Sequence, residues 1–283
     1  MIFAAAIAEA FRAACREEIE APKPGNVHVF AGGHNMEAAH FLTSAEASAG
    51  PLAAPGASVG ARVLGAVTAS FDAVGMNTNL GIVLLCAPLA AAAERGGPLR
   101  PALAHVLAGL DRNDADQVFR AIALANPGGL GAAAHHDVRH PADTSLLEAM
   151  REAAPRDRIA YQYASDFDDI FVTGLFALAE AQTRGLTSPL RAVAVYLVFL
   201  SSFADTHVFR KFGAGTAAEV RREATEMLLL FHSRRGDCLP ELLAFDQSLK
   251  ARGLNPGTSA DLTVATLFAD RLRNGLPSRR NDD

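Results

Sequence analysis

Residues 75 to 93 read Gly75-Met76-Asn77-Thr78-Asn79-Leu80-Gly81-Ile82-Val83-Leu84-Leu85-Cys86-Ala87-Pro88-Leu89-Ala90-Ala91-Ala92-Ala93. The part from Leu80 onward is apolar and rich in alanine, the residue with the highest helix propensity. It is too short to span a bilayer. We therefore predict a buried helix over residues 80–93.

Polar groups stand where this helix begins. Asn77, Thr78 and Asn79 offer amide and hydroxyl groups beside the unpaired N–H groups of a helix N-terminus, where anions bind. Ordinary helix capping is the alternative interpretation. Gly75 and Gly81 flank the segment and permit a close backbone approach. We favour a phosphate or ribose contact at Asn77, Thr78, Asn79 and Gly81.

The composition extends the helical prediction to the whole chain. Apolar residues make up 50% of the 283 residues, aromatic residues only 7%, and tryptophan is absent. Alanine is abundant and no segment alternates convincingly with a period of two, which argues against sheets. We predict one compact all-α domain over residues 1–275 and a frayed C-terminal tail over 276–283. Helices are expected at 1–14, 36–49, 59–73, 80–93, 99–110, 115–125, 157–163, 168–183, 190–203, 217–232 and 239–252, with further starts near Ser145 and Thr258.

Charge and cysteine content restrict the class of partner. The net charge of −5 provides no general field for nucleic acid. The three cysteines lie far apart in sequence without metal-ligand spacing, which is typical of reduced thiols. The N-terminal apolar stretch contains Glu9 and Arg12 and lacks the pattern of a signal peptide. We expect a cytoplasmic protein with no membrane or nucleic-acid partner, for which a homodimer is a possible assembly.

The second informative segment lies near the N-terminus and reads Glu18-Ile19-Glu20-Ala21-Pro22-Lys23-Pro24-Gly25-Asn26-Val27-His28. Two prolines fix the backbone on either side of Lys23 and end the preceding helix. A lysine held on a stiff segment suits a phosphate, which it binds as a point charge. A helix stop with a solvated lysine is the alternative. We predict phosphate or nucleotide contacts at Lys23, Gly25, Asn26 and His28.

Two further segments combine acids with other polar groups. Asp168 and Asp169 precede a predicted helix, and such carboxylates suit Mg²⁺ unless they only compensate the helix dipole. Asp205 is followed by Arg210 and Lys211, which indicates either a carboxylate and cations that grip a triphosphate or a charged helix end. We favour function for Asp205 and Lys211.

Five motifs in order along the chain resemble the triphosphoribosyl-dephospho-CoA synthase family. Besides the two segments quoted above, they are Gly33-His34-Asn35-Met36 with Phe41 and Ser44, Asp205-Thr206 with Lys211 and Gly213, and Asn255-Pro256-Gly257-Thr258-Ser259-Ala260-Asp261-Leu262. The resemblance implies site roles for His34, Ser44, Ser259 and Asp261. It implies transfer of the triphosphoribosyl group of ATP to an acceptor hydroxyl, with release of adenine.

The chain departs from that family at three motifs. His34-Asn35-Met36 lacks an aspartate, and Asn79-Leu80 stands where the family usually has histidine and lysine. The third is Ala125-Asn126-Pro127-Gly128-Gly129-Leu130-Gly131, followed by His135, His136 and Asp137. This segment resembles a branch of the family found in methanogens and methylotrophs, and it adds Asp137 to the candidate metal ligands.

The resemblance leads to a specific set of expectations. ATP is the co-substrate, Mg²⁺ is the cofactor, and the acceptor is either 3'-dephospho-CoA or a ribitol-bearing precursor of tetrahydromethanopterin. Glu18, Asp169 and Asp205 are candidate bases, and the candidate metal ligands are Asp137, Asp168, Asp169, Asp205 and Asp261. A noncatalytic nucleotide-binding protein and a kinase that releases ADP are the alternatives.

Overall fold

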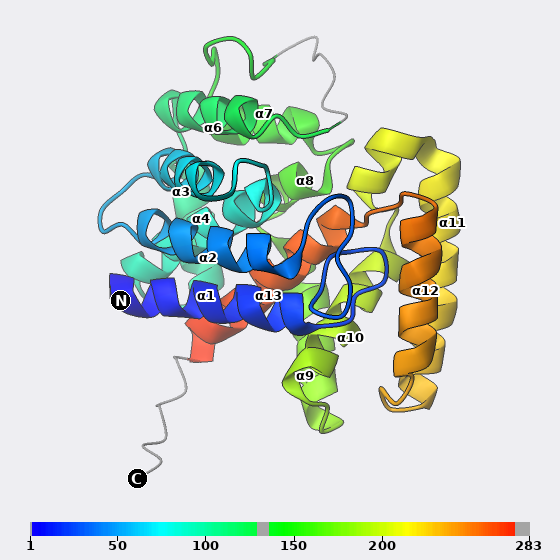
Figure 1. Cartoon of the computed structure of the whole chain (residues 1–283). Helices are drawn as coiled ribbons and strands as arrows, with labels where there is room; N and C mark the ends of the chain where they lie inside the picture. The colour runs from blue at the N-terminus through cyan, green and yellow to red at the C-terminus, as the bar shows by residue number, and fades with distance from the viewer. Residues whose placement is uncertain (1, 129–135, 275–283) are drawn as a thin grey trace.

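The computed structural model describes residues 2–128 and 136–274. Within these ranges the chain forms thirteen α-helices and one π-helix, and it contains no β-strand (Figure 1). The all-α prediction is confirmed. The predicted tail over 276–283 lies outside the described residues.

The elements follow one another with short connections. In chain order they are α1 (Ala4–Glu20), α2 (Ala38–Leu52), α3 (Val59–Val74), α4 (Leu80–Arg95), α5 (Leu99–Ala108), α6 (Arg112–Ala125), α7 (Leu146–Ala153), α8 (Arg158–Ala164), the π-helix η1 (Asp169–Gly174), α9 (Leu175–Thr183), α10 (Ser188–Ser202), α11 (Thr206–Ser233), α12 (Leu239–Ala251) and α13 (Gly257–Asn274).

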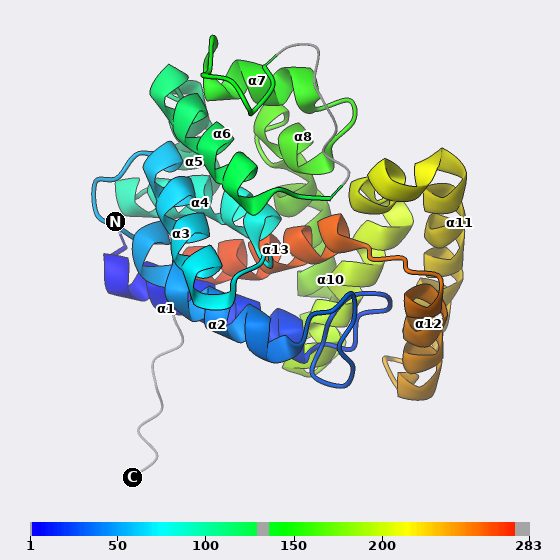
Figure 2. The ribbon, with the colours of Figure 1, turned by 45° about the horizontal axis from the view of Figure 1, so that its top comes forward.

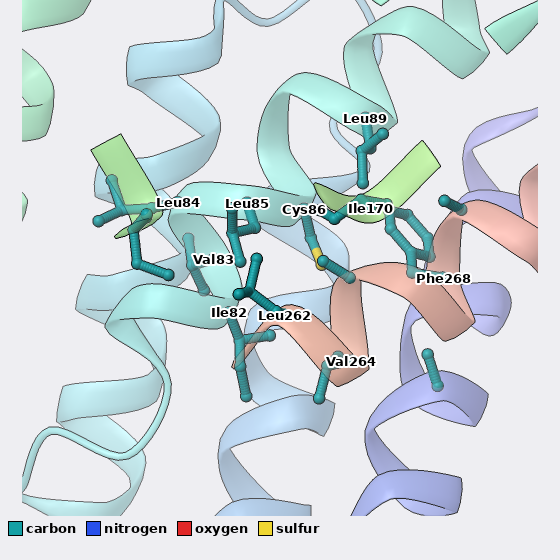
Figure 3. Close-up of a cluster of buried hydrophobic side chains, with 14 of the residues drawn as sticks. Ile82, Val83, Leu84, Leu85, Cys86, Leu89, Ile170, Leu262, Val264 and Phe268 are labelled. Atoms are coloured by element: carbon teal, nitrogen blue, oxygen red, sulfur yellow. The ribbon is translucent and has the colours of Figure 1, made fainter. Parts of the chain in front are cut away.

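The last helix lies at the centre of the molecule. α13 runs between the other helices in both views and packs against α1, α4 and α10 (Figures 1 and 2). The apolar run of α4 meets α13 in a dense cluster, in which Leu85 and Cys86 lie beside Leu262 and Phe268 (Figure 3). The predicted buried helix thus packs against the last described helix of the chain.

Two groups of helices flank this centre. α6, α7 and α8 lie together on one side, and α11 and α12 run side by side on another (Figures 1 and 2). Arg252, at the end of α12, forms an ion pair with Glu223 of α11 at 2.6 Å. The N-termini of α8, α11 and α13 therefore converge between the two groups.

Three helices differ from the sequence prediction. α1 continues to Glu20, and the helix expected over 168–183 begins with the π-helix η1. α11 begins at Thr206 instead of residue 217 and is interrupted at Gly213, where φ is 85° and ψ is 174°. Its first turns lack an apolar periodicity because polar side chains there face a cavity.

Two findings bear on the other sequence expectations. All three cysteines are free, in agreement with the predicted reduced thiols, and all three are buried. Burial raises the pKa of the Cys15 and Cys86 thiols, which opposes thiolate chemistry. In the described residues, no single helix has the length and apolarity to cross a membrane, although two sharply bent helix pairs meet both criteria together.

Candidate functional site

A cavity of about 810 Å³ opens where the flanking helices meet the centre of the molecule. Its walls come from the end of α1, the loops around residues 26–36 and 77–81, the helices α6 to α8, the first turns of α11 and the start of α13. Its volume lies in the upper part of the range for small-molecule sites, about 300–1,000 Å³. It has room for a nucleotide.

Asp261 is one of the acidic residues that line this cavity. Its carboxylate has no hydrogen-bond or ion-pair partner among the described residues, and it lines the wall beside Gly81. A Cβ atom at Gly81 would stand 2.0 Å from Asp261 Oδ2, so only glycine permits this placement. Burial and then the nearby carboxylates of Glu18, Asp205 and Asp157 raise the pKa of Asp261 well above its ordinary value.

Glu18 lines the same cavity and forms a buried pair with Lys23. Lys23 Nζ lies 3.1 Å from Glu18 Oε1. Burial raises the pKa of Glu18 and lowers the pKa of Lys23, each against the attraction of its partner. Of the predicted bases, Glu18 alone reaches the cavity wall.

Lys23 itself occupies a different position from the one predicted. The side chain is 0% exposed, and Nζ donates to the carbonyls of Glu18, Val27 and Ala21 at 2.7, 3.0 and 3.4 Å. It does not line the cavity, and its donors are used within the turn that follows α1. The geometry therefore gives Lys23 a structural role, because it holds the turn and neutralises Glu18.

Of the residues after Lys23, some hold the turn in place and others line the cavity. Gly25 has φ of 82° and donates its N–H to Asp246 of α12 at 2.8 Å, which docks the turn on that helix. His28 is buried with Nε2 3.4 Å from Asp246 Oδ2, and burial lowers its pKa. Neither residue lines the cavity. Asn26 and His34 do, and Asn26 donates to Asn255 across the wall at 2.8 Å.

In the segment before α4, too, some residues line the cavity and others make structural contacts. Asn77, Thr78 and Gly81 line the cavity, as the prediction requires. The hydroxyl of buried Ser44 lies 2.6 Å from the Thr78 hydroxyl and so contacts the wall from behind. Asn79 is turned toward α2 and α3, where its amide bonds to Ser48 and Ser70 at 2.8 Å each. Asn79 therefore joins helices instead of facing a ligand.

The first turns of α11 supply the cations. Arg210 and Lys211 both line the cavity, and Arg210 bonds to the Gly128 carbonyl at 3.2 Å and to Asp157 at 3.3 Å. Burial and the Arg210 charge lower the pKa of Lys211. His207 lies on the same wall, where burial and then the two cations lower its pKa to about 3. Its imidazole is thus neutral at ordinary pH.

Asp205, a predicted base and metal ligand, is a double helix cap. One oxygen accepts from the backbone N–H groups of His207 and Val208 at 3.0 and 3.2 Å, which caps α11. The other accepts from the N–H and hydroxyl of Ser259, each at 2.8 Å, at the start of α13. The Asp205 carboxylate is only 1% exposed and does not line the cavity. Asp205 and Ser259 therefore join α11 to α13, and the geometry does not support the predicted contacts of either with a ligand.

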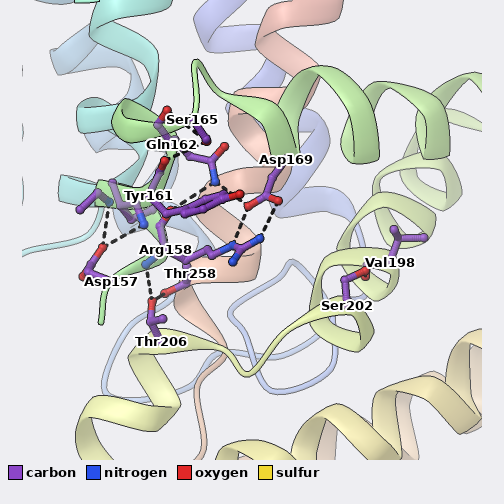
Figure 4. A network of polar contacts seen from close by, with 12 residues as sticks. Asp157, Arg158, Tyr161, Gln162, Ser165, Asp169, Val198, Ser202, Thr206 and Thr258 are labelled. Carbon is purple, nitrogen blue, oxygen red and sulfur yellow. Dashed lines mark hydrogen bonds and ion pairs between the residues drawn. The ribbon is translucent and has the colours of Figure 1, made fainter. Parts of the chain in front are cut away.

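Asp169 and Asp168 also lie outside the cavity wall. Asp169 forms a two-pronged ion pair with Arg158 at 2.7 and 2.8 Å and accepts from Gln162 at 2.6 Å (Figure 4). The Arg158 guanidinium stacks over the ring of Tyr161 at 4.0 Å. Asp168 pairs with Arg100 at 2.9 Å. Asp169 is thus joined to α8 and Asp168 to α5, and these contacts do not favour the predicted base and metal roles.

The five predicted metal ligands are not brought together. Asp137 lines the cavity and pairs with Arg139 at 2.8 Å, so only Asp137 and Asp261 of the five face it. Among the described residues, no group of three or more His, Cys, Asp or Glu side chains could hold a metal ion. Mg²⁺, however, is commonly bound by one or two carboxylates together with substrate phosphates. The partner-free carboxylate of Asp261 fits that mode.

Sequence reasoning missed several residues of the wall. His207, Asp157 and Arg156 line the cavity, as do apolar side chains from α6, α7 and α8. Asp157 is the first residue of the helix predicted over 157–163, and its Oδ1 caps α8 by accepting from the N–H groups of Ile159 and Ala160. The helix-capping pattern in the sequence could have identified Asp157 as a cap. Its contact with Arg210 could not have been predicted, because the two residues lie far apart in the sequence.

Comparisons with known proteins agree with one another. A family model described as ATP:dephospho-CoA triphosphoribosyl transferase matches residues 4–280. Over 89 residues the chain is 33% identical to the probable 2-(5''-triphosphoribosyl)-3'-dephosphocoenzyme-A synthase of Citrobacter koseri, a match that covers 31% of this chain and only 30% of that protein. A crystal structure from Archaeoglobus fulgidus, assigned as a triphosphoribosyl-dephospho-CoA synthase, superposes with a TM-score of 0.65 at 25% identity and covers 82% of this chain and 99% of that chain.

Proposed function

Because the chain belongs to the ATP:dephospho-CoA triphosphoribosyl transferase family, we propose that it transfers the 5-triphosphoribosyl group of ATP to an acceptor hydroxyl and releases adenine. The family match extends over residues 4–280, in agreement with the resemblance found in the sequence motifs. Activity and substrates are inferred for this chain from that membership and from the cavity.

One observation carries the proposal. A single cavity joins two cations, Arg210 and Lys211, with the carboxylate of Asp261, which has no hydrogen bond or ion pair with a described residue. Cations suit a triphosphate, and a buried carboxylate suits the positive charge that develops on a sugar ring when its glycosidic bond breaks. A reaction at the ribose carbon needs both the triphosphate-binding cations and the carboxylate, whereas simple nucleotide binding does not need a carboxylate for the sugar ring.

The chemistry is a single displacement at C1' of the ATP ribose. The acceptor oxygen forms a bond to C1' as the bond from C1' to the adenine nitrogen breaks, and adenine departs with the bonding electron pair and takes up a proton. Glu18 is the proposed base that removes the acceptor hydroxyl proton. Its raised pKa brings it closer to the pH at which a general base works best.

The proposed cofactor, Mg²⁺, fits this arrangement through a single carboxylate, that of Asp261. Asp261 would hold Mg²⁺ together with the phosphates of ATP, and the ion would neutralise triphosphate charge. Arg210 and Lys211 would hold the remaining phosphate oxygens. Asp205 and Asp169 take no part in this proposal because both oxygens of each are engaged elsewhere, and Asp168 takes none because it does not line the cavity.

Two acceptors remain candidates. The family description supplies dephospho-CoA. The ribitol-bearing tetrahydromethanopterin precursor is supported by the lining of the cavity, where Leu80 replaces the lysine usual in the family and removes a positive charge. Asn126, Pro127 and Gly128, from the motif of the methanogen and methylotroph branch, also line the wall. We propose the ribitol-bearing acceptor as the preferred substrate.

The deciding experiment is chromatography of ATP after incubation with the protein, Mg²⁺ and each acceptor in turn. Free adenine with either acceptor supports the transferase, and its rate identifies the preferred acceptor. ADP without adenine would assign a kinase. Binding of ATP without any turnover would assign a noncatalytic nucleotide-binding protein. Asp261→Asn is the matched variant, since it changes the charge and keeps the size of the side chain.

A further inference from the structure

The cavity has two ends of opposite chemical character. One end lies between α6, α7, α8 and α4, where apolar side chains form the wall: Phe119, Ile122, Leu146, Met150, Ile159 and Leu84. These helices lie together in both views of the molecule (Figures 1 and 2). Phe119, Leu146 and Ile159 are buried although they face the cavity. Glu152, Arg156 and Asp157 also line the cavity on this side, at the ends of α7 and α8. The apolar side chains form a surface that suits a flat aromatic ring.

The other end is lined by groups that form hydrogen bonds. Asn26 and His34 come from the loop after α1, and Asn77 and Thr78 precede α4. Glu18, the proposed base, stands at this end. Amide, imidazole and hydroxyl groups recognise several hydroxyls at once, as a sugar or polyol presents them.

Charged groups lie between the two ends. Asp261, Arg210 and Lys211 line the cavity from the first turns of α13 and α11. Arg210 bonds to Asp157, the residue that caps α8. The triphosphate and the ribose of the donor therefore belong in the middle of the cavity.

A single displacement at the ribose carbon places the incoming oxygen and the departing base on opposite sides of that carbon. The side of the incoming oxygen needs a base together with hydroxyl recognition, and Glu18 lies there with Asn26, His34, Asn77 and Thr78. We propose that the apolar end between α6, α7 and α8 is the pocket for the adenine ring of the donor, and that the polar end receives a hydroxyl-rich acceptor. This inference rests on the proposed transferase function and assigns each substrate to its part of the cavity.

The test fills the apolar end without removing packing. Ala149 of α7 lines this end, and Ala149→Phe places a ring in cavity space. Isothermal titration calorimetry then measures adenine and inorganic tripolyphosphate separately, each as a probe of one part of the donor. We expect the variant to bind adenine at least about tenfold more weakly and tripolyphosphate unchanged. Ala149→Leu should show a smaller loss of adenine affinity.

A substitution at the polar end is the matched control. Asn77→Leu should leave adenine affinity unchanged. It should weaken binding of whichever acceptor supports adenine release from ATP in the chromatography experiment. Any of three results would overturn the assignment. In Ala149→Phe these are unchanged adenine affinity or a loss of tripolyphosphate affinity, and in Asn77→Leu it is weaker adenine binding. Circular dichroism shows whether each variant is folded.

The outcomes separate this inference from the proposed function. If wild type releases no adenine from ATP but Ala149→Phe weakens adenine binding as expected, the base pocket stands and the transferase reaction does not. If adenine is released but its affinity does not respond to Ala149→Phe or Ala149→Leu, the reaction stands and the pocket assignment is wrong.

Discussion

Gly81→Ala tests whether the placement of Asp261 is required for activity. The new methyl carbon would stand 2.0 Å from Asp261 Oδ2 and 2.6 Å from Cγ. Since non-bonded heavy atoms settle at about 3.5 Å, the carboxylate must move by about 1.5 Å. A misplacement of about 1 Å can cost about 100-fold in rate, or about 2.7 kcal/mol of transition-state stabilisation.

The fold should tolerate this change. Gly81 lies in α4, where alanine favours the helix by roughly 0.5–1 kcal/mol over glycine and offsets part of the crowding. Gly50→Ala in α2 is the control, because a Cβ atom at Gly50 meets nothing within 4 Å. Adenine release should fall by about 100-fold or more in Gly81→Ala and remain at the wild-type level in Gly50→Ala.

A double-mutant cycle assigns the effect to Asp261. Gly81→Ala combined with Asp261→Ala should be no slower than Asp261→Ala alone, since the clash then has no target. Adenine release by Gly81→Ala within about threefold of wild type would show that the position of Asp261 does not matter, and the reasoning would be refuted. Additive losses in the double variant would refute it as well.

Three further predictions concern the residues around the cavity. Lys23→Met should lower the free energy of unfolding in urea by about 3–5 kcal/mol, because Glu18 is left as an unpaired buried charge; an unchanged midpoint would contradict the structural role. Asp205→Asn should also destabilise the protein, by about 1–3 kcal/mol, because an amide N–H₂ would meet donors at Ser259 or at the start of α11. A stable Asp205→Asn protein without activity would instead restore the catalytic role predicted from the sequence. The pKa of His207 is about 3 in the folded protein and about 6.5 in the unfolded chain, so the unfolded chain binds more protons between these values and stability is lost as pH falls below about 6.5. Between pH 7 and pH 5 this loss approaches about 2 kcal/mol, and His207→Gln should reduce the pH dependence of the free energy of unfolding, measured in urea, by that amount.

The sequence by itself determined the helical class and much of the cavity's composition. Alanine-rich apolar segments and capping residues predict helices because these signals act over one or two turns, and residues 80–93 form the buried helix that was expected. Glu18, Asn26, Asn77 and Gly81 were found for a similar reason, since each lies in a short segment whose backbone constraints are visible locally.

Only the tertiary structure decided which polar groups are free. Lys23, Asp169 and Asp205 look equivalent to functional residues in the sequence, but each has partners that no spacing reveals: Lys23 turns into its own loop, Asp169 meets Arg158, and Asp205 meets Ser259 from 54 residues away. Asp261 differs because the contact of α4 with α13 places it against Gly81 in the cavity. A carboxylate's availability depends on which donors surround it, and those donors are brought together by helix packing and not by the chain's order.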